Sequence, residues 1–264
     1  MKLDSLIKYL EKKFKPSLAA SWDYSGFQLF NGKKINIEKE IENVLICLDF
    51  TLEVFEKIKK ENYDLIISRH PFIFGDLKQN KKDPFKKEAI KFLKQNNIDI
   101  YSIHTNYDAS KNQEMFSILE NALPVKSISR WGLDKEGFEI NLKTKLSLEN
   151  INKILSKEFK SDFTFINSDE KEMFDNFKLV SGSGFTSVIE TSQKNILFVT
   201  GEMKWNEYIY AESNNISVIV LGHYMENYFI KDIENKIAER FGNTVNVNSF
   251  DIKNQFKVIE NKKV

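Results

Sequence analysis

The chain has little cysteine, little histidine and almost no net charge. Its 264 residues include one Cys and three His, and Lys+Arg 39 against Asp+Glu 38 leave a formal net charge of +1. One cysteine excludes an internal disulfide framework and argues against a thiolate metal site. A balanced charge creates no global field for nucleic acid or a membrane surface, so we predict neither as a partner.

Long apolar runs are also missing. Nowhere do about 18 apolar residues follow one another, so we expect no membrane span. The residues after Met1 lack the continuous apolar core of a signal peptide, and we therefore expect a soluble, cytoplasmic protein. Cys47 lies inside the apolar run 44–48, where a buried structural thiol is more common than a nucleophile.

The first half of the chain alternates between strands and helices. Apolar, β-branched runs predict strands over 43–48, 65–67 and 98–103. Helical spacing and start signals predict helices over 4–14, 51–60, 84–96 and 111–122. Such alternation is typical of parallel βαβ units. Each of the three strands is followed by an Asp or a His.

The second half is less regular. We expect strands over 138–142, 163–166, 177–180, 196–199, 217–221 and 244–258, and helices over 147–159, after 202 up to 214, and 226–241. The small-residue segment 181–184 suits an anion seat or a tight strand-to-helix turn, and the turn is favoured because no P-loop lysine follows. We predict a two-lobed α/β fold with mixed sheets, divided into residues 1–124 and 125–264, with the site in the cleft between the lobes.

All three histidines follow predicted strands directly. Asp108 lies four residues after His104, Glu226 lies three residues after His223, and His70 precedes Pro71. Imidazoles with carboxylates suit Zn, Mn, Fe or Ni, and strand ends in one sheet converge on one crevice. The spacing favours a shared divalent-metal site, with three unrelated loop histidines as the alternative.

Six segments resemble motifs of the GTP cyclohydrolase 1 type 2 family, the NGG-interacting-factor-like proteins, in the right order and over nearly the whole chain. They are Trp22-Asp-Tyr-Ser-Gly-Phe-Gln28, Leu48-Asp-Phe-Thr51 with Val54, Ile67-Ser-Arg-His-Pro-Phe-Ile-Phe74, His104-Thr-Asn-Tyr-Asp108, Thr200-Gly-Glu202 and Gly222-His-Tyr224. The resemblance implies toroidal homohexamers around dinuclear metal sites, with His70, Asp108 and His223 among the ligands.

The chain departs from the family pattern at three positions. Arg69 replaces the first of two adjacent histidines, and a permanently protonated guanidinium cannot ligate a metal. The family's closing glutamate falls on Asn227, one residue after Glu226, and Asn206 stands where the family usually has a histidine. Positions +3 and +4 share a helix face, so Glu226 can still serve as a ligand.

The substitution by Arg69 predicts about one metal ion per subunit instead of two. Its guanidinium would either replace the charge of the missing ion by neutralising Asp108 or Glu226, or hold a substrate phosphate. A third interpretation is drift in a lineage that no longer needs the second metal.

The resemblance implies hydrolysis of GTP or a related nucleotide by a metal-activated water, with His104 as the candidate for moving protons. One alternative is metal-assisted hydrolysis of another phosphorylated compound. The other is a non-catalytic metal-binding or partner-binding assembly protein, because a fold or site does not fix a reaction.

We predict an oligomer, most simply the homohexamer that the resemblance implies. Phe159, Phe163, Phe165, Phe174 and Phe177 are candidates for subunit contacts. Multi-angle light scattering at micromolar concentration should give about six times the subunit mass, and a monomer would refute the prediction.

Overall fold

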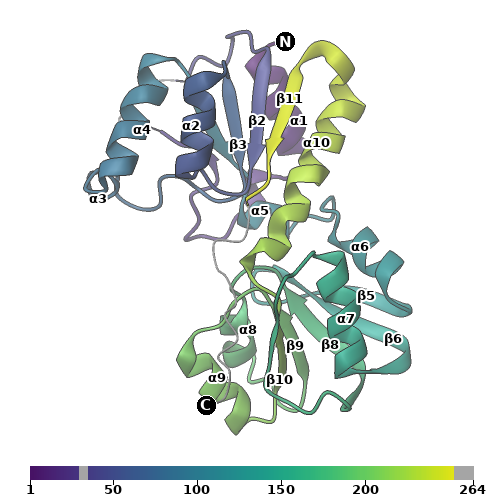
Figure 1. Ribbon diagram of the computed structural model, residues 1–264. Coiled ribbons are helices and arrows are strands. Elements are labelled where there is room, and N and C mark those ends of the chain that lie inside the picture. Colours follow the sequence, from purple (N-terminus) through teal and green to yellow (C-terminus); the bar gives the residue numbers. More distant parts are fainter. Residues whose placement is uncertain (30–34, 253–264) are drawn as a thin grey trace. The chain divides into compact units, whose positions relative to one another are not determined.

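A computed structural model describes residues 1–29 and 35–252. This part of the chain forms two compact units (Figure 1). The first unit contains residues 1–113 and 229–252, and the second contains residues 114–228. The two-lobed α/β class is confirmed. The expected division at residue 124 assigns everything after it to the second lobe, whereas residues 229–252 pack with the first unit.

The first unit is built on a five-stranded sheet in the order β1-β4-β3-β2-β11. The strands are β1 (Gly26–Phe27), β2 (Asn43–Cys47), β3 (Leu65–Ser68), β4 (Asp99–Ser102) and β11 (Asn246–Phe250). β11, β2, β3 and β4 are parallel, and only the pairing of β1 with β4 is antiparallel. The predicted parallel βαβ units are therefore confirmed.

Helices cover both faces of this sheet, with α2 and α4 on one side and α1 and α10 on the other (Figure 1). The helices are α1 (Leu3–Lys13), η1 (Pro16–Leu18), α2 (Leu52–Lys60), α3 (Leu77–Asn80), α4 (Pro84–Gln95), α5 (Thr105–Asp108), α10 (Tyr228–Phe241) and η3 (Gly242–Thr244). Thr51 caps α2 by accepting a hydrogen bond from the Val54 amide. Asp83 caps α4, with Pro84 at the first helical position.

Every residue of β3 is buried, as a strand covered on both faces requires. Leu45, Cys47 and Ile66 face the cluster formed with α2 and α4. The single thiol is thus part of the core, and its burial raises the pKa of Cys47 well above the ordinary thiol value. The predicted structural cysteine is confirmed.

The second unit is built on a six-stranded mixed sheet in the order β5-β6-β8-β9-β10-β7. The strands are β5 (Val125–Trp131), β6 (Gly137–Ser147), β7 (Phe165–Ile166), β8 (Met173–Val180), β9 (Leu197–Thr200) and β10 (Ser217–Val220). The helices are α6 (Met115–Ala122), α7 (Leu148–Glu158), α8 (Phe185–Glu190), α9 (Trp205–Ser213) and η2 (His223–Asn227). β8, β9 and β10 are parallel, and the other pairings are antiparallel.

The second sheet also has two apolar faces. One packs against α6 and α7, and the other packs against α8 and α9. Phe159 and Phe177 belong to the first of these cores, so the idea that they face a neighbouring subunit is wrong: the unit needs them for its own interior. Phe165 is the exposed member of that group, at 57%.

Most elements lie within a few residues of their predicted positions. Among the longer strands, β5 was not predicted, and α6 begins four residues later than predicted. The predicted strand over 244–258 corresponds to β11, a sheet-edge strand, and its part after 252 lies outside the described residues.

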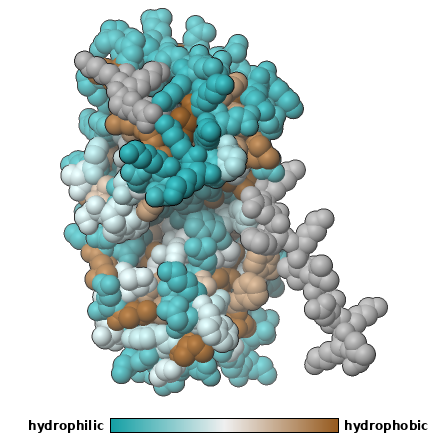
Figure 2. All heavy atoms as spheres, turned by 90° about the vertical axis from the view of Figure 1, so that its left-hand side faces the viewer, coloured by the Kyte–Doolittle hydropathy of each residue, from teal (hydrophilic) through white to brown (hydrophobic). Residues whose placement is uncertain are grey.

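Hydrophilic side chains cover most of the surface of the first unit visible in Figure 2, with hydrophobic side chains between them. Within residues 1–29 and 35–252, no helix has the length and apolar character needed to cross a membrane.

Replacing Phe198 by Ala should strongly destabilise the protein. The side chain is fully buried on β9, and its ring lies 5.5 Å from that of Phe185 and 5.9 Å from that of Trp131. Truncation of a buried Phe costs about 3–5 kcal/mol. The matched control is Phe165→Ala on the edge strand β7 of the same sheet, expected to cost less than about 1 kcal/mol because Phe165 is exposed. Urea unfolding measures both, and equal losses would contradict this view of the core.

Candidate functional site

The candidate residues of the first unit lie where its parallel strands end. Asp49 follows β2, Arg69 and His70 follow β3, and His104 follows β4. Because β2, β3 and β4 are parallel and adjacent, their carboxyl ends share one edge of the sheet. The rings of His70 and His104 accordingly lie 5.4 Å apart between centroids.

His70 is held by its backbone and by a carboxylate. Its amide donates to the Leu48 carbonyl at 3.0 Å, and the Ser68 hydroxyl donates to its carbonyl at 2.8 Å. Nδ1 of His70 lies 2.8 Å from Oδ1 of Asp49. A carboxylate at one ring nitrogen fixes the orientation and the tautomer of a histidine, an arrangement typical of metal-ligating imidazoles.

His104 has a similar partner that is far more deeply buried. Its Nδ1 lies 2.7 Å from Oδ1 of Asp23, whose side chain is fully buried. Asp23 also accepts hydrogen bonds from Ser25 Oγ at 2.5 Å and from the amide and hydroxyl of Thr105. Burial acts to raise the pKa of Asp23, but the hydrogen bond and charge of His104, with the hydroxyl hydrogen bonds, outweigh it and hold that pKa far below its usual range. Asp23 is therefore a permanent carboxylate that orients His104.

Arg69 lies inside the first unit. Its side chain is 1% exposed, and its Nη2 lies 2.6 Å from Oδ1 of Asp108. Nη1 donates to the carbonyls of Ile103 and His104. The guanidinium also lies 5.3 Å from the ring centroid of Tyr107 and 6.0 Å from that of Phe229. The expectation that Arg69 reaches Asp108 is confirmed.

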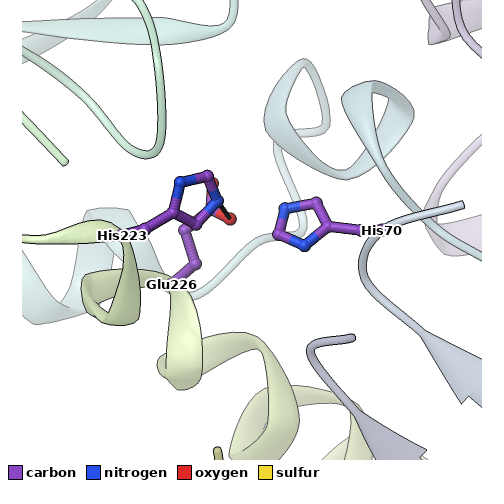
Figure 3. Close-up of side chains that lie close together, drawn as sticks. All are labelled: His70, His223 and Glu226. Carbon is purple, nitrogen blue, oxygen red and sulfur yellow. Dashed lines mark ion pairs between the residues drawn. The ribbon is translucent and has the colours of Figure 1, made fainter. Parts of the chain in front are cut away.

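In the second unit, His223 lies between two carboxylates. Its Nε2 is 3.2 Å from Oε2 of Glu226, and its Nδ1 is 3.2 Å from Oε2 of Glu202 (Figure 3 draws the pair with Glu226). The Glu226 side chain is 4% exposed, whereas that of Glu202 is 55% exposed. A buried carboxylate beside an imidazole is a strong pair of donors for a divalent cation.

The local helix type explains why Glu226 takes the place expected for residue 227. Residues His223–Asn227 form a 3₁₀ helix, η2. A 3₁₀ helix has 3.0 residues per turn, so side chains at i and i+3 lie directly above one another. Glu226 is therefore aligned with His223, and the shorter spacing brings the carboxylate to the imidazole.

The segment 181–184 forms the expected tight turn, and Gly182 lies close to Glu226. The carbonyl of Gly182 accepts hydrogen bonds from the amides of Gly201 and Glu202 and from the hydroxyl of Thr200. Gly182 has φ +66°, and a Cβ there would lie 2.8 Å from Oε1 of Glu226. Glycine is thus required both by the backbone and by the close approach of the carboxylate.

The donor set fits a divalent metal. His70 and His223 are imidazoles oriented by carboxylates, and Glu226 supplies a buried anionic oxygen. Arg69 offers only donors and no lone pair, so the position where the family pattern has a histidine contributes no ligand.

Comparison with known proteins identifies the family. The sequence matches the Duf34/NIF3 (NGG1p interacting factor 3) family over residues 1–256. The chain belongs to this family. It is 30% identical over 250 residues to a GTP cyclohydrolase 1 type 2 homolog of Mycoplasmopsis pulmonis, covering 93% of this chain and 96% of that protein. It is 27% identical over 242 residues to the GTP cyclohydrolase 1 type 2 of Helicobacter pylori, covering 92% and 93%.

Solved structures with the same fold include a Staphylococcus aureus protein, with a TM-score of 0.80 and 21% identity over 98% of this chain and 99% of that one. Reduced HcgD from Methanocaldococcus jannaschii gives a TM-score of 0.79 and 23% identity over 96% and 98% of the two chains. These likenesses show that the chain shares its fold with both proteins.

Sequence reasoning missed the three supporting carboxylates. Asp23, Asp49 and Glu202 each contact a histidine. Each lies inside a motif that resembles the family, and Asp49 and Glu202 each lie two residues after the end of a strand, β2 and β9. Their place beside strand ends was the available signal, but the partner of each could be identified only once the strand order was known.

Changing Arg69 to His should raise the metal content per subunit. The variant replaces a permanent cation with a neutral ligand and releases the Asp108 carboxylate from its ion pair. After loading with Zn or Mn, inductively coupled plasma mass spectrometry should show more bound metal in the Arg69→His variant than in the unmodified protein.

Arg69→Lys is the matched control, because it keeps the positive charge and adds no ligand at neutral pH. Its metal content should match that of the unmodified protein. If the unmodified protein already binds two ions per subunit, the assignment of Arg69 as the substitute for one of them is wrong.

Proposed function

We propose that this protein binds one divalent metal ion per subunit and hydrolyses GTP or a related nucleotide. The proposed ligands are His70 from the first unit with His223 and Glu226 from the second. The observation that carries the proposal is the chemistry of these donors: two carboxylate-oriented imidazoles and one buried carboxylate.

The divalent metal would polarise the substrate and lower the pKa of a water molecule towards neutrality. Zn, Mn, Fe and Ni all suit imidazole and carboxylate donors. Asp49 and Glu202 would orient the two imidazoles, and Glu226 would offset part of the positive charge.

His104 is the residue that we assign to proton transfer. Its Nδ1 is engaged by the buried Asp23 carboxylate, so Nε2 is the atom that would accept or deliver a proton. A histidine oriented by a buried carboxylate is the arrangement that general bases use in many hydrolases.

The contacts of Arg69 with Asp108 distinguish between the two roles expected for this arginine. Oδ1 of Asp108 pairs with Arg69, and the guanidinium also donates to two backbone carbonyls. These contacts favour Arg69 as the replacement for a metal charge over Arg69 as a phosphate-binding group. We therefore assign Asp108 to balancing the charge of Arg69, in place of the ligand role that the family resemblance implies.

The names of the relatives support a nucleotide substrate. Proteins 27–30% identical to this chain over most of their length are described as GTP cyclohydrolase 1 type 2 or its homolog. The alternative is a non-catalytic metal-binding assembly protein, and the replacement of a ligand by Arg69 is the observation that favours it. Both functions are compatible with the homohexamer proposed from the family resemblance.

Replacing His70, His223 or Glu226 by Ala should lower metal content and hydrolysis in parallel, because the activated water is lost with its metal. Asn227→Ala is the matched control: it alters the position where the family pattern has its glutamate and should leave metal content unchanged. Metal analysis and the loss of guanine absorbance on ring opening of GTP measure the two effects.

His104→Ala should separate the two readouts, with near-normal metal content and a rate about 10²–10⁴-fold lower. Full activity in the His70→Ala variant would show that hydrolysis does not depend on the metal. If metal-loaded protein hydrolyses no nucleotide, the proposed enzyme function is wrong and the non-catalytic assembly protein becomes the better account.

A further inference from the structure

An exposed aromatic cluster lies beside the histidines of the first unit. Trp22, Tyr24 and Phe74 are 54%, 45% and 51% exposed. The ring of Phe74 lies 4.9 Å from that of Tyr24 and 6.3 Å from that of Trp22. Exposing apolar rings to water is unfavourable, and exposed apolar patches mark interaction or ligand-binding sites.

The backbone beneath the cluster is fixed by hydrogen bonds. The buried Gln28 side chain donates to the carbonyls of Tyr24 and Gly26 and accepts from the amide of Ile73. It therefore ties the segment that carries Trp22 and Tyr24 to the segment that carries Phe74. The Phe74 carbonyl also accepts a hydrogen bond from Asn80 Nδ2 at 2.8 Å. The rings are thus held at the surface on a preorganised support, which lowers the entropy cost of binding.

The cluster is continuous with the chemistry of the site. Trp22 meets the ring of His104 at 5.9 Å and 78°, and His104 is 5.4 Å from His70 between ring centroids. Asp23, the residue after Trp22, is the buried carboxylate that orients His104. A ligand lying on Trp22 would therefore be next to the residue that we assign to proton transfer.

The rings are tilted relative to one another, so a flat ligand would stack on one of them and meet the others at an angle. Trp22 and Phe74 meet at 47°, Tyr24 and Phe74 at 64°, and Trp22 and His104 at 78°. These tilted and edge contacts differ from parallel stacks, in which one ring covers the face of the other. Aromatic faces bind planar heterocycles by stacking, and any nucleobase has a suitable π-face.

We propose that Trp22, Tyr24 and Phe74 form a stacking platform for the planar heteroaromatic ring of the substrate, a purine base in the case of a nucleotide. The proposal rests on the proposed function for the identity of the ligand. It adds that the ring is recognised by the first unit alone, independently of the metal ligands. Trp22 is the central residue, because it contacts both Phe74 and His104.

The test compares two ligands that differ only in the ring, guanosine 5′-monophosphate and ribose 5-phosphate, by calorimetry on the full-length protein with and without EDTA. Trp22→Ala should weaken binding of the nucleotide about 5- to 100-fold, since stacking on one aromatic side chain is worth that factor. Trp22→Phe should retain most of the affinity, because it keeps an aromatic face. Binding of ribose 5-phosphate should be weak and insensitive to the substitution.

Trp205→Ala is the matched control, since Trp205 is 78% exposed and lies in the second unit. It should bind the nucleotide like the unmodified protein. Phe74→Ala, a second change in the platform, should weaken binding in the same direction, and melting temperatures confirm that each variant is folded.

Three outcomes would overturn the platform: equal nucleotide affinity in Trp22→Ala and the unmodified protein, equal losses for both ligands, or no detectable nucleotide binding by the unmodified protein at millimolar concentration. A shift of the oligomer to a smaller species in Trp22→Ala, with nucleotide affinity kept, would instead make the cluster a protein contact. Metal analysis and turnover test the proposed hydrolysis separately. If hydrolysis fails, nucleotide binding measured in EDTA still tests the platform.

Discussion

The interior of the first unit is arranged around the guanidinium of Arg69, which keeps its positive charge because it does not lose its proton. Arg69 is buried, and an uncompensated guanidinium there would cost several kcal/mol, on the order of 3–5 when one partner of a buried pair is lost. The unit satisfies it with the Asp108 carboxylate, two backbone carbonyls and the faces of Tyr107 and Phe229. These contacts join the ends of β3 and β4 to the start of α10. The charge thus fixes the backbone around His104 while it occupies the place of a metal ligand.

Much of the fold follows from local pattern. The buried strands of the first unit are apolar and β-branched, and Thr51 and Asp83 are helix caps with recognisable spacing. His70 and His104 could be assigned to one site because strand ends of a parallel sheet share an edge, and the two rings do lie side by side. The same reasoning fails for His223, because it follows β10 of the other sheet. Arg69 could be expected to pair with Asp108 or Glu226, because a permanent cation at a ligand position needs an anion nearby, and its partner is Asp108.

Other features depend on information that local pattern does not carry. β5 lacks a clean alternation of apolar residues, since its pairing with β6 contains a register shift between Val125 and Ser127. The choice of Glu226 over Asn227 depends on whether η2 is an α-helix or a 3₁₀ helix, a difference that the sequence of five residues does not determine. The partners of Asp23 and Glu202 are set by tertiary contacts.

Because residues 229–252 return to the first unit, that unit cannot complete its sheet until late in synthesis. β11 pairs in register with β2, joining residues such as Asn43 and Asn246 that are 203 apart in sequence. Until the ribosome has released Asn246–Phe250, β2 has an open edge, and open edges favour pairing with other chains. Closure over so long a separation is also slow. The second unit, whose segments are contiguous from 114 to 228, can complete its sheet earlier, so the nascent first unit is the stage at which chaperones would be needed most.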